Sequence, residues 1–311
     1  MKKIFFLFTV FYLSVFFLPS CSGDAKKFTD NQIFPVCLVL KNDIEISPFP
    51  FTKSIPAYTP SDPHSLSGEN TSLFTRIEYM VFQKEDDVLI KQKTLTKENS
   101  DDFGAYIYDE LKAGIYRIVL FAHSASEMNL TDYSLSGTDL SDSFYAIKEI
   151  TVGTANEDTP VEITLKRIVA KITLCATKEV PPKATKFILE ISERYNELDI
   201  KSGTATTPQS LRKEYPLSPN NPDGIKPDYS FYTFIPAQEE GDTTYLGSIK
   251  LITLDSRNDT LHTHLIPSVP VMRNRITHYS GSLYAPDTNP NTINLDIEDQ
   301  GAWKDSINIH F

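Results

Sequence analysis

Two histidines at alternate positions, His262 and His264 in LHTHL, are the first candidates for chemistry. On a strand their imidazoles would share one face and could bind a metal ion. No neighbouring cysteine or carboxylate pattern supplies further ligands, so surface histidines at a sheet edge explain the pair better. The acidic pairs Glu239–Glu240 and Asp86–Asp87 fall at predicted turns, where solvated acids are the simpler explanation than acid–base catalysis. No serine has the sequence context of a nucleophile elbow. We therefore predict no catalytic residue, no metal, no cofactor and no enzymatic activity. A catalytic triad whose members come together only on folding would show no local sequence motif.

The thiol of Cys21 is the remaining reactive group with a clear context. Residues 1–20 open with two lysines and continue IFFLFTVFYLSVFFLPS, the plan of a secretory signal, without a basic stop-transfer flank after it. The stretch LPSC at 18–21 resembles the lipobox of bacterial lipoproteins, in which the cysteine is diacylated and the signal is cut before it. We therefore expect a signal peptide at 1–20 and lipidation of Cys21. The alternative is an ordinary signal with an incidental cysteine.

Composition sets the class of the remaining chain. The formal net charge of −11 becomes −13 once residues 1–20 are removed, because that segment holds two lysines and no acidic residue. An acidic chain has no electrostatic footprint for nucleic acid. Twenty prolines, one tryptophan and many Tyr, Phe, Ile, Val and Thr residues favour a β-rich secreted protein. Cys37 and Cys175 each lie in an apolar alternating run, which indicates two separately buried thiols, with a disulfide as the alternative.

Runs of period two follow a polar tether at 21–33 and continue along the chain, with no sustained helical period. FPVCLVL at 34–40 predicts the first strand, and a proline-rich loop follows it. Residues 76–95 predict a hairpin that turns at Asp86–Asp87, with one buried face on its first arm. Segment 124–137 is the one place where we expect a helical turn.

The run PVEITLKRIVAKITLC at 160–175 is too long for one average strand and is interrupted by Lys166–Arg167. We interpret VEITL as the last strand of one domain and IVAKITL as the first strand of the next. The prediction is therefore an all-β chain of two tandem β-sandwich domains at 34–165 and 166–311.

Several stretches resemble the fimbrillin superfamily of Bacteroidetes, surface lipoproteins that build or anchor pili. The similar segments occur in the family's order along the chain: LKAGIYRIVLFAH at 111–123, LKRIVAKITL at 165–174, VPVMRNRITHYSGSLY at 269–284, and Trp303 followed by SINIHF. The resemblance implies transthyretin-like Greek-key sandwiches and an outer-membrane, lipid-anchored location on the cell surface or in a fimbrium. It also implies other fimbrial subunits as partners, and ligands on host or bacterial surfaces as a further partner class.

Assembly by strand exchange is the mechanism that the resemblance implies. A subunit loses its first strand to a protease, and a neighbour's strand fills the groove. The candidate donor is the terminal SINIHF, where Ile307, Ile309 and Phe311 project on one face and would each contribute roughly 1.5–3 kcal/mol when buried. The alternative is that SINIHF completes its own domain.

Processing is the feature that would separate stalk from anchor. Stalk subunits of the family are cut after an arginine behind the first strand, but no arginine lies between Cys21 and Arg76. Lys41 and Lys53 are the candidate sites for a protease of wider specificity. An uncut subunit keeps its first strand, which favours an anchor or regulatory subunit over a stalk subunit.

Two other functions remain to be weighed against a fimbrial role. An outer-membrane lipoprotein that binds glycans for an uptake system would need an exposed aromatic platform. With Trp303 as the only tryptophan, that platform would come from tyrosines such as Tyr229 and Tyr232, which also fit a strand core. A secreted hydrolase has no motif in its favour.

Overall fold

The structure is a computed structural model that describes residues 32–42, 73–131, 133–153, 159–218, 229–236 and 242–285, and the backbone of 293–296. The described residues form β-strands and connecting turns without a helix, so the predicted all-β class is confirmed for them. Within these ranges no helix is long and apolar enough to cross a membrane. The signal peptide, Cys21 with nearly all of the tether, Lys53, and the terminal SINIHF lie outside the described residues.

The first large sheet is built from seven strands of residues 33–167. Its order is β3-β2-β5-β8-β9-β1-β4, and every neighbouring pair is antiparallel except β1–β9. The pair β8–β9 has only two residue pairs, and the sheet folds over there to enclose one apolar core. The strands are β1 (Ile33–Asn42), β2 (Arg76–Gln83), β3 (Leu89–Thr96), β4 (Tyr106–Lys112), β5 (Gly114–His123), β8 (Ser143–Val152) and β9 (Val161–Arg167).

The second large sheet repeats the arrangement with residues 169–296. Its order is β18-β17-β11-β15-β10-β20-β21, with β14 paired to β11. The first strand β10 lies between antiparallel β15 and parallel β20, just as β1 lies between antiparallel β4 and parallel β9. The strands are β10 (Val169–Ala176), β11 (Lys186–Tyr195), β14 (Pro208–Pro216), β15 (Tyr229–Phe234), β17 (Ile249–Leu254), β18 (Thr260–Ile266), β20 (Ile276–Gly281) and β21 (Ile293–Asp296), with the separate pair β16 (Thr244–Leu246) and β19 (Val269–Val271).

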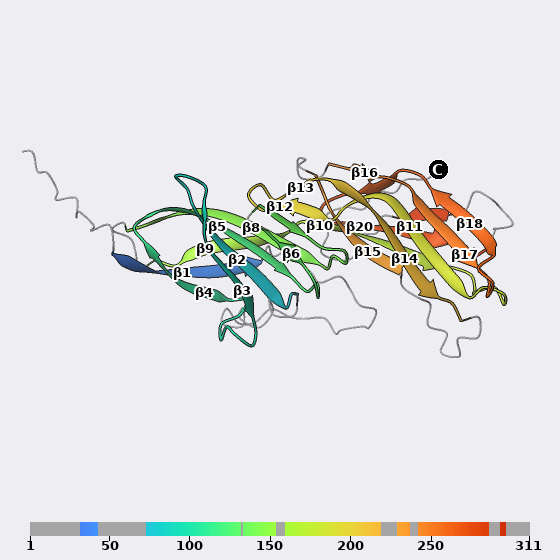
Figure 1. Cartoon of the computed structure of the whole chain (residues 1–311), viewed down its shortest axis with the longest axis horizontal. Coiled ribbons are helices and arrows are strands. Elements are labelled where there is room, and N and C mark those ends of the chain that lie inside the picture. Colours follow the sequence, from blue (N-terminus) through green and yellow to red (C-terminus); the bar gives the residue numbers. More distant parts are fainter. Residues whose placement is uncertain are drawn as a thin grey trace, which may run out of the picture.

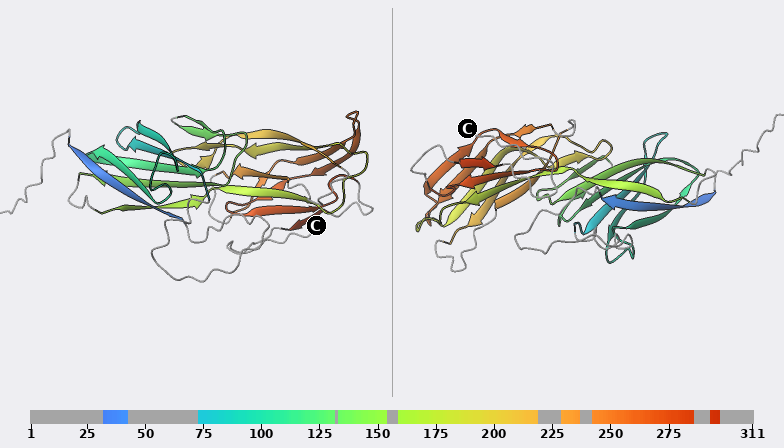
Figure 2. Two further views of the ribbon diagram at one scale, coloured as in Figure 1. Left: turned by 90° about the horizontal axis from the view of Figure 1, so that it is seen from below. Right: turned by 180° about the vertical axis from the view of Figure 1, so that it is seen from behind.

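The two sheets lie end to end along the long axis of the molecule (Figures 1 and 2). Strand β9 ends at Arg167 and β10 begins at Val169, so only Ile168 connects them. The sequence had suggested that Lys166 and Arg167 interrupt the run. Both residues instead belong to β9, and the break between the strands falls at Ile168. The domain limits 34–165 and 166–311 stay a prediction.

A small sheet joins the two halves of the chain. Its order is β13-β12-β7-β6, and β7 pairs with β12 from Ser134–Asp199 to Ser136–Glu197. The helical turn expected at 124–137 is therefore wrong: this segment forms β6 (Asn129–Leu130) and β7 (Ser134–Ser136), and the second half supplies β12 (Glu197–Asp199) and β13 (Thr204–Ala205).

The small sheet covers the outer face of β2 and β5. Met80 and Phe82 of β2 are fully buried there and cluster with Leu135 of β7 and Leu198 of β12. The prediction of one buried face for β2 is therefore wrong, because Ile77 on its other face is also fully buried in the main core. A strand that is covered on both faces buries consecutive side chains, so an alternating pattern cannot identify a single buried face.

Candidate functional site

Strand β1 occupies the centre of a three-stranded layer and closes the first core. It pairs antiparallel with β4 from Ile33–Lys112 to Val39–Tyr106, and parallel with β9 from Leu38–Val161 to Asn42–Leu165. Its inward side chains are all buried, with exposed fractions between 0% and 8%: Phe34, Val36, Leu38 and Leu40. At about 1.5–3 kcal/mol for each, these four side chains contribute roughly 6–12 kcal/mol to the closed state.

The position of β1 defines what its removal would create. Without β1, the edges of β4 and β9 would face each other with unpaired N–H and C=O groups above an apolar floor. Such a groove accepts another extended segment with apolar residues at alternate positions. The chemistry available at this site is therefore backbone hydrogen bonding and apolar burial.

Lys41, one of the two candidate processing residues, lies inside β1 near its end. It is opposite Thr164 in the parallel ladder, and its Nζ is 2.6 Å from Oε1 of Glu162. The two side chains are 50% and 63% exposed, so the ion pair itself is weak. A protease would have to unpair the end of β1 to reach the bond after Lys41.

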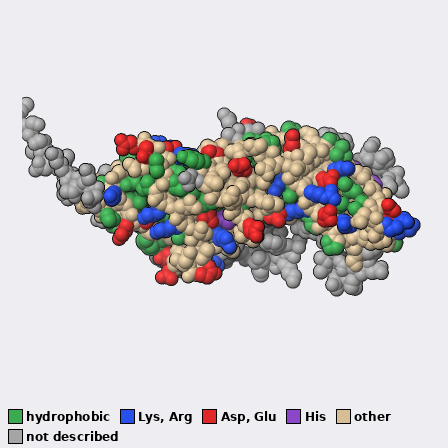
Figure 3. Space-filling view, in the orientation of Figure 1, with side chains coloured by type: hydrophobic (Ala, Val, Ile, Leu, Met, Phe, Trp, Pro, Cys, Tyr) green, Lys and Arg blue, Asp and Glu red, His purple; other side chains and the backbone are tan. Residues whose placement is uncertain are grey.

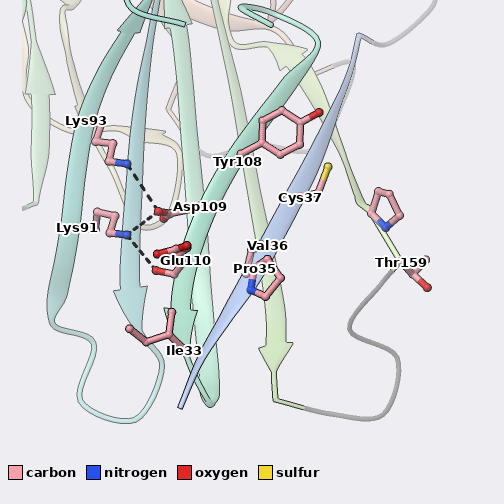
Figure 4. Close-up of a pocket in the computed structure, with 11 residues that line it drawn as sticks. Ile33, Pro35, Val36, Cys37, Lys91, Lys93, Tyr108, Asp109, Glu110 and Thr159 are labelled. Carbon is pink, nitrogen blue, oxygen red and sulfur yellow. Dashed lines mark hydrogen bonds and ion pairs between the residues drawn. The ribbon is translucent and has the colours of Figure 1, made fainter. Parts of the chain in front are cut away.

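A buried carboxylate closes the seam between the edge strands β3 and β4. Asp109 of β4 accepts a hydrogen bond from Lys91 of β3 at 2.5 Å, and Lys93 lies 3.7 Å away (Figure 4). Asp109 also accepts a hydrogen bond from the Tyr79 hydroxyl at 2.7 Å. Burial opposes ionisation of Asp109, but the hydrogen bonds from Lys91 and Tyr79 outweigh it and hold the pKa of the carboxyl below its usual value. Lys91 also donates to the backbone oxygen of Glu110, which occupies an acceptor on the outer edge of β4.

A clamp around Arg167 joins the two halves at their shortest connection. The Arg167 guanidinium donates to both carboxylate oxygens of Asp142, at 2.7 and 2.8 Å, and to Oδ1 of Asn274 at 2.9 Å. It also lies 5.0 Å above the Phe144 ring. Asn274 adopts a φ of 59°, which asparagine tolerates better than most residues, and its N–H donates to the carbonyl of Val169. Sequence reasoning singled out both segments by resemblance but missed that they meet.

Two further cations cross between the halves. Arg194, 2% exposed, donates to the backbone carbonyls of Thr138 and Tyr232, and burial lowers its pKa to about 10. Lys201 at the tip of the β12–β13 hairpin donates to Asp87 at 2.6 Å. The turn predicted at Asp86–Asp87 is confirmed, and Asp87 there also binds Arg117.

The histidine pair lies on an edge strand of the second large sheet. His262 and His264 lie on one face of the edge strand β18 with ring centroids 6.4 Å apart. Burial lowers the pKa of both, and the neighbouring His264 lowers that of His262 further. Across the described ranges, no three His, Cys, Asp or Glu side chains are grouped to hold a metal ion.

The remaining sequence candidates are placed clearly. Cys37 in β1 and Cys175 in β10 are both free thiols, so the disulfide is not formed, but both are only half-buried and the predicted burial of the two thiols is wrong. Tyr229 is fully buried and its hydroxyl lies 2.7 Å from that of Tyr284, which places it in the core and excludes it from an exposed platform. Tyr232 is half-buried beside the cluster between the two halves.

The family relationship follows from a direct comparison. The family model described as fimbrillin-A associated anchor proteins Mfa1 and Mfa2 matches residues 67–310. The chain belongs to this anchor-protein family. Accordingly, this member of the anchor-protein family is a structural or adhesive subunit of surface fimbriae, and it associates with other fimbrial subunits at the cell surface.

Solved structures similar to this anchor-family protein share little sequence with it. A candidate adhesin from Bacteroides ovatus is 12% identical, with 76% of this chain and 84% of that chain covered and a TM-score of 0.48. The fimbrial anchor protein Mfa2 from Porphyromonas gingivalis is 11% identical, with 80% and 91% covered and a TM-score of 0.43. A fimbrial assembly protein from Parabacteroides distasonis is 11% identical, with 86% and 96% covered and a TM-score of 0.43. A search of curated proteins finds no match.

Proposed function

We propose that this protein is the base subunit of a fimbria, held in the outer membrane by lipid on Cys21 and keeping β1 in its own sheet. The observation that carries the proposal is the placement of β1, with pairing on both edges and four buried apolar side chains. A subunit with a filled groove cannot accept a donor strand there. It therefore ends the chain of subunits on that side.

The processing residues support retention of β1. No arginine lies between Cys21 and Arg76, and Lys41 is held in the ladder and paired with Glu162. Lys53 stays a candidate from the sequence alone. If a protease did cut there, β1 would still have to leave a core that it stabilises by several kcal/mol.

The connection to the next subunit is proposed to run through the terminal SINIHF. Ile307, Ile309 and Phe311 alternate as a donor strand requires. They would insert into the groove of a neighbouring subunit that has lost its own first strand. The alternative, in which SINIHF completes the second sheet of its own chain, predicts no partner for this segment.

The anchor is tested in cells that carry Cys21→Ala. We expect this variant to lose incorporation of labelled palmitate and to leave the membrane fraction. Its fimbriae should detach from the cells and appear as shed fibres in electron microscopy. Cys37→Ala is the matched control and should stay membrane-bound. Retention of Cys21→Ala in the outer membrane would refute the lipid anchor.

The donor strand is tested separately with Ile307→Asp/Ile309→Asp. Charged residues cannot enter an apolar groove without a large desolvation penalty. Pull-down of other fimbrial subunits should fail, while membrane attachment persists. Leu261→Asp, at an exposed position of β18, is the control substitution. Unchanged recovery of partner subunits with the donor variant would refute strand donation.

A further inference from the structure

A hollow lies beside the layer formed by β4 and β1, next to Thr159 and Pro160, which precede β9. Its volume is about 770 Å³, within the range of small-molecule sites. Pro35 and Cys37 of β1 and Tyr108 and Glu110 of β4 line it, with Lys93 of β3 at one margin. Figure 4 shows Tyr108 and Cys37 on neighbouring strands, with the lysines reaching from β3. We name this surface the outer hollow.

Aromatic rings stand on the outer face at this point. Tyr108 is 62% exposed and lies directly opposite Cys37 in the ladder, while Tyr106, two residues earlier on the same face, is 37% exposed. Their rings are nearly parallel, with 16° between the planes and 6.1 Å between the centroids. Exposed tyrosines that present ring faces beside an apolar strand are available to stack on a ligand.

Polar groups at the margin are held in place before any ligand arrives. Asp109 is fixed by Tyr79 and Lys91, and this fixed carboxylate in turn holds the ammonium of Lys93 at 3.7 Å. The side chain of Lys93 is 48% exposed and keeps donors for a ligand. A margin of this kind supplies hydrogen bonds without a large ordering cost on binding.

The charged and aromatic side chains that line the outer hollow indicate which class of ligand it binds. Both signs of charge line the outer hollow, through Lys93 and Glu110, and acidic and basic side chains are interspersed among the described residues on the face in Figure 3. This arrangement gives no strong preference for an anion or a cation. An added β-strand is also disfavoured, because Lys91 occupies the Glu110 carbonyl on the free edge of β4. A neutral pyranose ring, with an apolar face and a rim of hydroxyls, fits stacked tyrosines and mixed donors and acceptors.

We propose that the outer hollow binds a neutral pyranose unit of a surface polysaccharide, with Tyr108 stacking on the sugar ring and Tyr106 stacked beside Tyr108. Lys93 and Glu110 orient the sugar hydroxyls. Partial desolvation and the nearby Asp102 raise the pKa of Tyr108, so its O–H stays neutral and also serves as donor or acceptor. The site would make a fimbrial subunit adhesive without using the β1 groove.

The test measures binding of the purified protein to immobilised yeast mannan, laminarin and dextran, with chondroitin sulfate and a six-residue β-strand peptide as comparators. We expect retention on at least one neutral polysaccharide. Tyr108→Ala should weaken it roughly tenfold, which corresponds to about 1.4 kcal/mol. Tyr108→Phe keeps the ring and should stay within about threefold, because stacking carries most of the contact.

Tyr245→Ala is the matched control, since Tyr245 is 60% exposed on β16 in the other half of the chain. It should bind as the unsubstituted protein does, and both alanine variants should keep the same melting temperature because both rings are exposed. The proposal is overturned if no neutral polysaccharide is retained, or if Tyr108→Ala binds unchanged. Retention of chondroitin sulfate or the peptide alone would also overturn it, and would indicate an anion or strand site.

Discussion

Replacing Arg167 with methionine tests the clamp between the two halves. Methionine keeps apolar volume above Phe144 but removes both hydrogen bonds to Asp142 and the one to Asn274. The side chain of Arg167 is fully buried and that of Asp142 is only 15% exposed, so the substitution leaves a carboxylate largely desolvated and unpaired. Breaking a buried pair in this way costs about 3–5 kcal/mol of unfolding free energy.

The loss should depend on pH, and the sign follows from Asp142. Burial raises the pKa of Asp142 even though Arg167 opposes the shift. Without Arg167 the pKa rises further, so the folded state keeps a proton that the unfolded state has released above about pH 4. Stability of the variant therefore falls as pH rises through this window. The penalty relative to the unsubstituted protein should be smaller near pH 5.5 than near pH 8.

Chemical denaturation followed by circular dichroism measures both effects. Arg257→Met is the matched control, because Arg257 is 79% exposed and pairs with Asp255 and Asp259 at the surface. We expect the control to change stability by no more than about 0.5 kcal/mol. Equal losses for the two variants, or a loss for Arg167→Met that is the same at both pH values, would refute the reasoning.

Three further substitutions test other parts of the structure. Leu38→Asp places a charge at a fully buried position of β1 and should cost about 3–5 kcal/mol in chemical denaturation, whereas Val88→Asp, at an exposed position, should cost little. Equal losses for these two variants would contradict the sealing role of β1. Asp109→Asn should lower the free energy of unfolding by about 2–3 kcal/mol near pH 7. This difference should shrink as pH falls through the lowered pKa of Asp109, because the carboxylate of the unsubstituted protein is then protonated. A difference that persists in acid, measured by denaturation, would contradict this prediction. Gly203→Ala should destabilise the protein by about 2 kcal/mol in thermal melts, because Gly203 has a φ of 65° and an added Cβ would lie 2.5 Å from the Tyr145 ring. Gly114→Ala should cost less, and equal melting temperatures for the two variants would show that the hairpin tip can move.

Local patterns predicted the strands that carry the large sheets. FPVCLVL became β1 as predicted, but its faces were not as predicted: Cys37, expected to be buried, is only half-buried, and the buried face carries Leu38. The strand could be predicted because a short apolar run of four to eight residues, bounded by polar residues, favours an extended and buried segment. The hairpin at Asp86–Asp87 was predictable for a similar reason, since turn residues separate two such runs.

The contacts between the halves could not be predicted from local pattern. Arg167 and Asn274 are 107 residues apart, and nothing in either segment indicates the other. Strands β6, β7, β12 and β13 have two or three residues each, too few for a period to be recognised. The outer hollow was missed because Tyr106 and Tyr108 lie on a short edge strand, where exposed and buried tyrosines look the same in sequence.

The small sheet also determines how the molecule would respond to stretching along its length. Covalently, a single residue, Ile168, separates the two large sheets, which by itself would behave as a hinge. The β7–β12 ladder, the bond from the Tyr145 hydroxyl to the carbonyl of Ile200, and the Arg167 clamp lie in parallel with that connection. Tension applied at the ends would be divided among them and would load several bonds in shear, so the first mechanical failure should be a cooperative rupture of this junction and not a gradual bending.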